Sequence, residues 1–437
     1  MDKEKRAQLD REQVKRTADS FQNTLTRLGE GLPNLMSGTR YPLTRLTQNQ
    51  GLMNSLYRNH WIVRRIVDTI PEDMCRNWLR FNTSAVPEDL RVLQDVLRAT
   101  RTRQRLIDGL KWGRLYGGAA GVMLLKSHEG RLETPLIQEE VQPGDYRGLL
   151  ILDRWQGVQV SRERVEDLSD PDFGLPRYYD VITPGGRLVR VHHSRVLRFL
   201  GDALPASEAQ SEDLWGASVV EAVFDELKKR DNTSYNIANL VFLANLRIYK
   251  TEMVDLMGLA TEGMQQDFYN VMAAMNSMMN SSGMSVIGKN DEFEVRQYSF
   301  GGIHEIYEAF MLDVAGACGI PATRLFGRSP AGMNATGESD LIHYYERIEE
   351  KQAAILAPIL DKLLPVAARS AWGRDPGGLS YDFAPLKRPD ARENAEVVKT
   401  LTEAVIHAAE AGLITPDQAR RELKEMSAST GVWTNLT

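Results

Sequence analysis

The chain has 437 residues, of which 42% are hydrophobic and 26% are charged, a globular composition that excludes a disordered chain. It contains no apolar run of about 18 residues, which excludes a membrane-spanning helix, and its two cysteines, Cys75 and Cys318, form no C-x-x-C pair for a metal or redox site. Residues 1–115 carry 21 basic and 13 acidic side chains, a net charge of +8, whereas the remainder carries −14, so we expect any contact with DNA to be loose and independent of sequence.

The length of the chain favours two or three domains or subdomains. Its first quarter is predicted to be mainly helical. Residues 1–30 are expected to form either a polar helical arm or a solvated tail without fixed structure, and residues 31–50, rich in turn formers, are expected to form a loop. Apolar residues then recur at three-and-four spacing from Leu52 to Ile70, which predicts an amphipathic helix that ends near Pro71. Further helices are expected from Pro87 and, with basic character, over about 102–115.

A region rich in strands comes next. Gly117, Gly118 and Gly121 precede an apolar run at 122–125, which indicates a tight turn into a buried strand. The order is helix, glycines and strand, the reverse of a phosphate-binding loop, so no nucleotide site is predicted there. Residues 149–200 are predicted to be β-rich, with a hairpin formed by 178–182 and 188–192.

The second half is mainly helical around a small insert. A long helix is expected from about Ala217 into the 240s, and a second over about 254–281. Two short strands are predicted at 284–287 and 293–298. A clean apolar stripe then runs along a helix from Ile303 to Cys318, which Gly319 and Pro321 end.

The C-terminal third begins with a glycine-rich loop over 324–338. A helix from about Glu338 to Leu364 should be kinked by Pro358, because proline lacks a backbone donor. A loop with a short strand is expected over 370–390. Two helices are then predicted within 391–425, the second capped by Thr415 with a proline at its first position.

Catalytic motifs are scarce. The sequence holds no Walker A pattern, which excludes the ATP motor of a packaging machine, and no Gly-x-Ser-x-Gly or His-Glu-x-x-His motif. His192 and His193 are adjacent, and neighbours on a strand point to opposite faces, so we expect them to be edge-strand or turn residues that share no metal. No cofactor and no metal are therefore expected.

Three stretches carry a resemblance to a known family. The stretches are Val191-His192-His193-Ser194-Arg195-Val196-Leu197-Arg198-Phe199 with Leu214-Trp215-Gly216, then Gly319-Ile320-Pro321 with Leu325-Phe326-Gly327 and Ala331-Gly332-Met333-Asn334, and last Gly412-Leu413-Ile414-Thr415-Pro416. In this order they resemble the portal proteins of tailed phages, in the portal family whose members also carry an anti-CBASS-like name. The resemblance covers about residues 50–425.

The resemblance implies an α+β fold, mainly helical, with a wing, stem, clip and crown assembled as a ring that is usually twelve-fold. On this sequence it implies an N-terminal arm at 1–50, a wing at 51–215, a stem helix at 216–249, a clip at 250–300, an inner stem helix at 301–324, a tunnel loop at 325–338, a wing return helix and strand at 339–390, and crown helices at 391–437.

The implied function is a portal at a capsid vertex of the virion, assembled in the host cytoplasm, for DNA packaging and ejection. The implied partners are further copies of the chain in a dodecamer, double-stranded DNA bound without sequence preference, the major capsid protein and scaffold, terminase and a head–tail adaptor, with no membrane. The tunnel loop would present Phe326, Arg328, Ser329, Met333 and Asn334 to DNA. The inner stem helix would offer Ile303, Ile306, Phe310 and Val314 as an interface.

Two alternatives remain open. A two-histidine phosphoesterase, an anti-defence enzyme, needs two His-x-[Ser/Thr] motifs, one histidine as base and the other as acid. Only His192-His193-Ser194 fits that pattern. The other alternative is a different ring-forming head–tail connector, such as an adaptor, although adaptors are typically much shorter than this chain.

Overall fold

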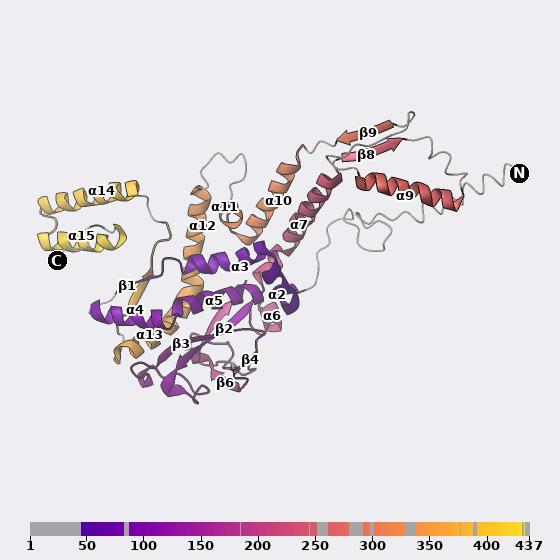
Figure 1. The fold of residues 1–437 in the computed structure, drawn as a ribbon. Helices are drawn as coiled ribbons and strands as arrows, with labels where there is room; N and C mark the ends of the chain where they lie inside the picture. The colour runs from indigo at the N-terminus through magenta and orange to yellow at the C-terminus, as the bar shows by residue number, and fades with distance from the viewer. Residues whose placement is uncertain are drawn as a thin grey trace. The chain divides into compact units, whose positions relative to one another are not determined.

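The computed structural model describes residues 45–82, 87–183, 185–243, 245–250, 261–278, 292–297, 301–327, 338–375, 377–387, 391–430 and 432. Contacts within the chain divide it into two units, Met1–Arg45 and Leu46–Thr437, and only Arg45 of the first unit is described. Residues 1–44 of the predicted N-terminal arm therefore lie outside the described residues, whereas its end forms the 3-10 turn η1 (Leu46–Gln48) and the first residue of α2 (Gln50–Asn59). The elements below belong to the second unit (Figure 1).

Helices dominate the described residues. In chain order the longer ones are α2 (Gln50–Asn59), α3 (Trp61–Met74), α4 (Pro87–Ala99), α5 (Thr102–Tyr116), α6 (Ala206–Ser211), α7 (Val219–Leu243), α9 (Glu262–Met278), α10 (Ile303–Cys318), α11 (Ala322–Phe326), α12 (Glu338–Lys351), α13 (Ala357–Trp372), α14 (Ala391–Glu410) and α15 (Pro416–Thr430). Short 3-10 turns are η1 (Leu46–Gln48), η2 (Lys126–His128), η3 (Gln138–Glu140) and η4 (His193–Arg195). None of the helices in these ranges is both long and apolar enough to cross a bilayer.

The strands form small antiparallel sheets. They are β1 (Leu79–Asn82), β2 (Gly118–Leu125), β3 (Tyr146–Asp153), β4 (Val158–Val160), β5 (Tyr178–Ile182), β6 (Leu188–His192), β7 (Val196–Leu200), β8 (Asn245–Lys250), β9 (Glu292–Gln297) and β10 (Ser380–Phe383). Their orders are β3-β2-β7, β4-β5-β6, β1-β10 and β8-β9. The predicted class, mainly helical with some sheets, is confirmed.

Helix α5 packs on the sheet β3-β2-β7, and glycine makes the close approach possible. A Cβ atom on Gly113 would lie 2.8 Å from the Phe199 carbonyl oxygen of β7. Gly117 ends α5 at a φ of +81°, and a Cβ atom there would lie 2.2 Å from the Gly216 carbonyl oxygen. The predicted tight turn is thus where the backbone of Gly117 meets the backbone of Gly201 and of Gly216, whose N–H groups both donate to the Gly117 carbonyl oxygen. This is a packing contact and not the arrangement of a phosphate-binding loop.

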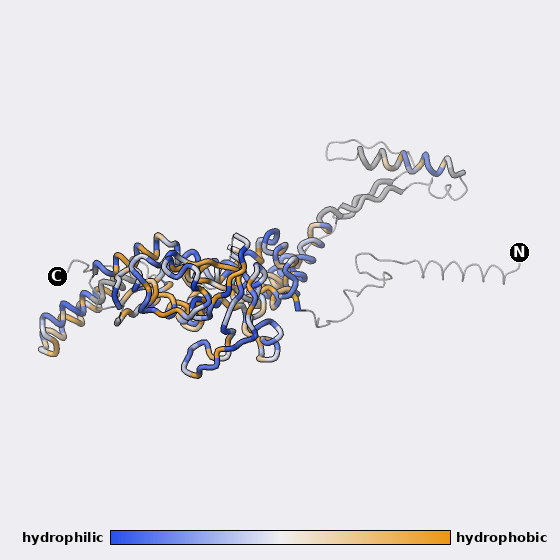
Figure 2. The backbone as a smooth tube through the Cα atoms, turned by 90° about the horizontal axis from the view of Figure 1, so that it is seen from below, coloured by the Kyte–Doolittle hydropathy of each residue, from blue (hydrophilic) through white to orange (hydrophobic). Residues whose placement is uncertain are grey.

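The main apolar core joins α3, α5, α13 and the buried face of the sheet β3-β2-β7. A second apolar cluster lies between β2 and the sheet β4-β5-β6, called the hairpin sheet below. Figure 2 shows the apolar residues, in orange, gathered where these helices and strands pack together. Helices α7 and α10 pack side by side and enter the main core at the ends that meet α3 and α5.

The helix predicted from Leu52 to Pro71 differs from the observed structure in two respects. The helix breaks at His60, whose ring Nδ1 accepts the Val63 N–H at 3.4 Å and so caps a new helix, α3. Pro71 does not end α3, which continues to Met74. Proline leaves the carbonyl of Val67, four residues earlier, without its helical donor. The Arg114 guanidinium supplies that donor, from Nε to Val67 at 3.3 Å and from Nη2 to Ile66 at 2.9 Å.

The helix predicted at 338–364 is longer and is interrupted. A π-helical segment, η5 (Gln352–Leu356), separates α12 from α13, which ends at Trp372. Pro358 cannot donate to the carbonyl of residue 354, and a π turn is one way for a helix to pass such a gap. The irregularity predicted at Pro358 is therefore confirmed, but it takes the form of a π segment one turn earlier.

The stem helix ends sooner than predicted. Helix α7 stops at Leu243, and residues 245–250, expected to lie in the helix, form β8, which pairs with β9 from Asn245–Gln297 to Lys250–Glu292. Residues 245–248 alternate polar and apolar side chains, the period of a strand and not of a helix. The strand predicted at 284–287 lies outside the described residues.

Candidate functional site

The two long helices α7 and α10 form one continuous surface that the sequence associates with assembly. Their inner faces are buried in the main core, which takes Val220, Val223 and Leu227 from α7 and Val314 and Ala315 from α10. An Arg230 side-chain nitrogen on α7 donates to the Tyr307 hydroxyl on α10, while Nη1 pairs with Asp231 at 2.8 Å. Apolar packing and a side-chain hydrogen bond thus join the two helices within one chain.

The four predicted interface residues of α10 divide between the two faces. Val314 is fully buried within the chain, so it leaves no surface for a neighbouring subunit. Ile303 and Phe310 are half-buried, and Ile306 is 56% exposed. These two helices expose further apolar side chains, namely Leu312 on α10 and Tyr235 and Leu240 on α7.

The predicted tunnel loop lies largely outside the described residues, which include Phe326 but not Arg328, Ser329, Met333 or Asn334. Phe326 is the last residue of α11 and makes an edge-to-face contact with Trp61, with ring centroids 6.1 Å apart. The Arg65 guanidinium donates to the Arg324 and Leu325 carbonyl oxygens at 3.2 and 3.0 Å. The N-terminal side of the loop is therefore fastened to α3.

A buried carboxylate, missed by sequence reasoning, joins both sides of this loop. Asp73 of α3 is 1% exposed, and its two oxygens accept from Arg324 of α11 at 2.7 and 3.2 Å. The Tyr344 hydroxyl of α12 donates to the same carboxylate at 2.8 Å. Burial and the Asp73 charge raise the pKa of Tyr344, which keeps its hydroxyl a donor. A signal existed, since Asp73 continues the apolar face of Ile62, Ile66 and Ile70 at helical spacing.

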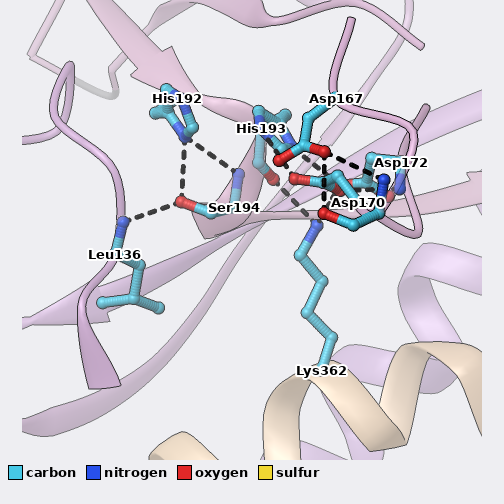
Figure 3. A network of polar contacts seen from close by, with 9 residues as sticks. Leu136, Asp167, Asp170, Asp172, His192, His193, Ser194 and Lys362 are labelled. Atoms are coloured by element: carbon cyan, nitrogen blue, oxygen red, sulfur yellow. Dashed lines mark hydrogen bonds and ion pairs between the residues drawn. The ribbon is translucent and has the colours of Figure 1, made fainter. Parts of the chain in front are cut away.

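His192 and His193 lie in a polar network at the end of β6 (Figure 3). His192 Nδ1 accepts the Ser194 backbone N–H at 3.3 Å, so the Ser194 hydroxyl, 2.9 Å from the same nitrogen, donates to it. The hydroxyl oxygen also accepts the Leu136 N–H at 2.7 Å. Burial and the charges of His193 and Arg177 lower the pKa of His192 to about 4. This histidine is therefore neutral at pH 7 and caps the local turn η4.

His193 belongs to an ion-pair cluster with loop 167–175 and helix α13 (Figure 3). Its Nδ1 lies 2.8 Å from Asp172 Oδ2, and its Nε2 lies 3.7 Å from an Asp170 oxygen. Lys362 Nζ donates to Asp172 at 2.7 Å and to the His193 carbonyl oxygen at 2.9 Å. Burial alone would raise the pKa of Asp172, but the bonds from His193 and Lys362 outweigh it and lower that pKa to about 2.

The expected location of the two histidines is confirmed, because His192 ends the edge strand β6 and His193 begins the turn η4. The expected orientation is wrong, because His193 does not continue the strand, and the two ring centroids lie 4.3 Å apart. Both rings are buried, at 5% and 7% exposure. Asp170, Asp172 and Lys362 were not singled out from the sequence, because their proximity depends on a turn and a distant helix.

The cluster of His193, Asp170, Asp172 and Lys362 has side chains that could bind an ion, but its contacts are those of a structural network that joins two parts of the chain. Single ligand atoms of Asp170, Asp172 and His193 lie within 4.8 Å of one another, close enough for a metal ion. The Lys362 ammonium already neutralises Asp172, and a cation beside it would be repelled. Each histidine binds a different partner through Nδ1, Ser194 for one and Asp172 for the other. The direct effect of the network is to tie the hairpin sheet to α13.

Comparison with known proteins identifies relatives over most of the chain. A family model described as phage portal protein matches residues 52–406. A protein of Haemophilus influenzae, described as uncharacterized, is 29% identical over 394 residues, which are 90% of this chain and 86% of that protein. The anti-CBASS protein Acb1 of a Caulobacter species is 30% identical over 397 residues, 87% of this chain and 61% of that protein.

A second protein named anti-CBASS protein Acb1, from Sphingomonas paeninsulae, is 29% identical over 430 residues. The alignment covers 93% of this chain and 66% of that protein. This chain therefore spans less than two thirds of the length of either protein that carries the Acb1 name.

Solved structures show the same fold at low sequence identity. A chain from the neck of a native gene transfer agent (GTA) particle, computed with C12 symmetry, has a TM-score of 0.50 and 16% identity, covering 89% of this chain and 96% of that one. A chain from the neck of an empty GTA particle, computed with C6 symmetry, has a TM-score of 0.50 and 17% identity over 88% of this chain and 95% of that one. With the family match over residues 52–406, these comparisons show that the chain belongs to the phage portal protein family.

Proposed function

We propose that this chain is one subunit of a twelve-membered portal ring at a capsid vertex, through which DNA is packaged and ejected. The observation that carries the proposal is the exposed apolar side chains of the packed pair α7 and α10, in a chain of the portal family. They are Ile306 and Leu312 of α10 and Tyr235 and Leu240 of α7. Several exposed apolar side chains on two adjacent helices favour an interface.

A ring buries such a surface in every copy. Each subunit contacts the next through two different faces, and the contact closes when the rotation between subunits is a fraction of a full turn. The C12 symmetry of the neck structure that shares the fold supports the number twelve. A two-fold dimer would bury the surface as well, but it would form no channel.

The parts of a portal can be assigned to the described elements. We assign α2 to β7, within 51–215, to the wing, and α7 and α10 to the stem, with the inner stem helix at 301–324. The pair β8-β9 and helix α9 fall in the clip, which we now begin at β8. The wing return at 339–390 holds α12, α13 and β10, and the crown at 391–437 holds α14 and α15.

The tunnel loop at 325–338 is proposed to line the channel. Arg328 is the single charged residue between Phe326 and Gly337, so twelve copies would place about a dozen positive charges around the channel. Salt limits the reach of such charges to about 8 Å at physiological ionic strength, so duplex DNA could slide past them. The network of Asp73, Arg324 and Tyr344 supports this role, because it fixes both flanks of the loop.

We predict that Arg328→Glu leaves ring assembly intact but impairs DNA packaging or retention, because attraction to phosphate becomes repulsion. The measurement is the yield of DNA-filled heads relative to proheads in a complementation assay. Arg98→Glu, at an exposed arginine of α4 whose only described ion pair is with Asp95, is the matched control and should behave like wild type. Filled heads at the normal yield with Arg328→Glu would show that the loop is only a connector.

The remaining partners are those that a portal requires. We propose contacts with the major capsid protein and scaffold around the ring, with terminase during packaging and with a head–tail adaptor afterwards. They place the protein in the virion, after assembly in the host cytoplasm. The family match and the shared fold support a head–tail position.

An enzymatic role is the other reading, favoured by the two relatives named anti-CBASS protein Acb1. We propose instead that the activity in that name resides in the part of those relatives beyond this chain, 39% of one and 34% of the other by length. In this chain the one His-x-Ser motif is used to cap a turn, with the Ser194 hydroxyl bound to His192. The test is to assay the purified chain and the double variant His192→Ala with His193→Ala for hydrolysis of cyclic nucleotides. Hydrolysis by the wild type that is lost in the double variant would contradict this proposal.

A further inference from the structure

A small cavity with an excess of positive charge lies where the stem helices enter the wing. Its volume is about 110 Å³, and its lining comes from five helices and one loop. The lining residues are Ile70, Arg114, Asp202, Val219, Ala317, Cys318, Gly319, Arg347 and Lys351. Helix α7 begins and helix α10 ends at this point, so the positive end of one helix dipole and the negative end of the other oppose each other.

The side chains leave the cavity with a net charge of +2. Arg114, Arg347 and Lys351 line it together with a single carboxylate, Asp202. Across the residues that the structure describes, no ion pair within 4.0 Å joins Asp202 to any of the three cations, and no hydrogen bond holds the Lys351 ammonium. Like charges that line one cavity repel one another, and the repulsion is stronger at the half-buried Arg114 and Lys351 than at the exposed Arg347, because burial lowers the local dielectric constant.

Arg114 is held in place by contacts that leave its charge unneutralised. Its Nε and Nη2 donate to the Val67 and Ile66 carbonyl oxygens, the first of which Pro71 leaves without its helical donor. The Arg347 guanidinium lies over Gly319, where a Cβ atom would be only 2.5 Å from Nη1. Burial, with the neighbouring charge of Arg114, lowers the pKa of Lys351. The three cations therefore meet because the fold brings them together, and among the side chains that line the cavity only the Asp202 carboxylate opposes their charge.

We propose that this cavity binds a small inorganic oxyanion of the phosphate or sulfate class. A tetrahedral oxyanion fits a space of this volume, and its oxygens can accept from two guanidinium groups and an ammonium at once. The cavity is too small for the backbone of a DNA duplex, which distinguishes it from the tunnel loop. The bound anion would join the start of α7, the end of α10 and the end of α12, and so stabilise the junction of stem and wing.

The test is the melting temperature (Tm) of the full chain in phosphate compared with chloride at the same pH and ionic strength. We expect phosphate to raise the Tm of wild type, with the shift growing with the logarithm of phosphate concentration once the site is saturated. Lys351→Gln should lose most of that shift. In chloride, the same variant should melt at or above the wild-type temperature, because the substitution relieves repulsion between like charges. Lys228→Gln, at an exposed lysine on α7, is the control and should respond to phosphate as wild type does.

Three results would overturn the proposal. One is an equal Tm in phosphate and chloride, and another is the same phosphate shift in wild type and Lys351→Gln. The third is a lower Tm for Lys351→Gln in both buffers, which would show that Lys351 pairs with a carboxylate, for example in a neighbouring subunit. A short DNA duplex added in chloride separates the two sources of phosphate. If it raises the Tm through Lys351, the cations serve nucleic acid and not a free anion.

Discussion

At the scale of the residue, the most consequential side chain is Asp73, a carboxylate buried under the two flanks of the tunnel loop. We predict that Asp73→Asn lowers the free energy of unfolding by about 2 to 3 kcal/mol, because the amide keeps only one acceptor oxygen for the three bonds from Arg324 and Tyr344 and removes the negative charge that pairs with Arg324. The figure is at the lower end for a buried pair, since Arg324 is 39% exposed and water screens part of the charge. Urea denaturation measures the change.

Asp95→Asn is the matched control for that measurement. Asp95 pairs with Arg98 on the surface of α4, with both side chains mostly exposed, and should cost less than about 1 kcal/mol. Equal losses in the two variants would mean that the Asp73 network contributes no more than a surface ion pair. The loop flanks would then be held by apolar packing, such as the contact between Trp61 and Phe326.

The histidine network makes stability depend on pH. The pKa of His192 is about 4 in the folded chain and 6.5 as a reference, so this histidine takes up a proton on unfolding between these values. Its contribution to stability is therefore complete above pH 6.5 and is lost as the pH falls towards 4, by at most about 1.4 kcal/mol per pH unit. Asp172, with a pKa lowered to about 2, adds a loss only below its reference value of 3.8.

We predict that His192→Asn flattens the fall in stability between pH 6.5 and 4, because the amide oxygen can still accept the turn N–H but takes up no proton. The free energy of unfolding measured across this range checks the prediction. His343→Asn, at an exposed histidine of α12, should keep the wild-type slope. An unchanged slope in His192→Asn would mean that other groups carry the acid sensitivity.

At the scale of the element, the helices and strands were predicted correctly from the sequence where they depend on neighbouring residues. The hairpin of 178–182 and 188–192, the helices from Pro87 and over 102–115, and the capped start of α15 are all confirmed. In α15, Thr415 Oγ1 accepts the Gln418 N–H at 3.3 Å, and the Gln418 side chain accepts the Thr415 N–H at 2.8 Å. Each of these features depends on residues within a few positions of one another.

Elements that depend on distant partners could not be predicted in the same way. Strand β1 pairs with β10 some 300 residues away, from Leu79–Phe383 to Asn82–Ser380, and β8 pairs with β9 across the insert. Pro71 was expected to end a helix, since nothing near it in sequence shows that Arg114 will take over the freed carbonyl. The candidate sites could not be predicted for the same reason, because Asp172 contacts His193 and Lys362, which are distant in sequence, only in the folded chain.

At the scale of the whole molecule, the proposed portal function depends on assembly. The α7–α10 pair buries part of its surface in its own chain and exposes the apolar side chains of Ile306, Leu312 and Tyr235. If neighbouring subunits cover these side chains, charged substitutions there should prevent assembly without unfolding the chain. Leu168→Asp offers a matched control, because Leu168 is also apolar and is 83% exposed, but it lies in the loop of the hairpin sheet.

Particle imaging of the purified protein, with the mass of the particles in solution, tests this claim most directly. We predict rings of twelve subunits with a central channel for wild type and for Leu168→Asp, and folded, smaller species for Ile306→Asp with Leu312→Asp. A wild-type protein that is folded but monomeric at micromolar concentration, or rings that persist in the double variant, would contradict the portal assignment.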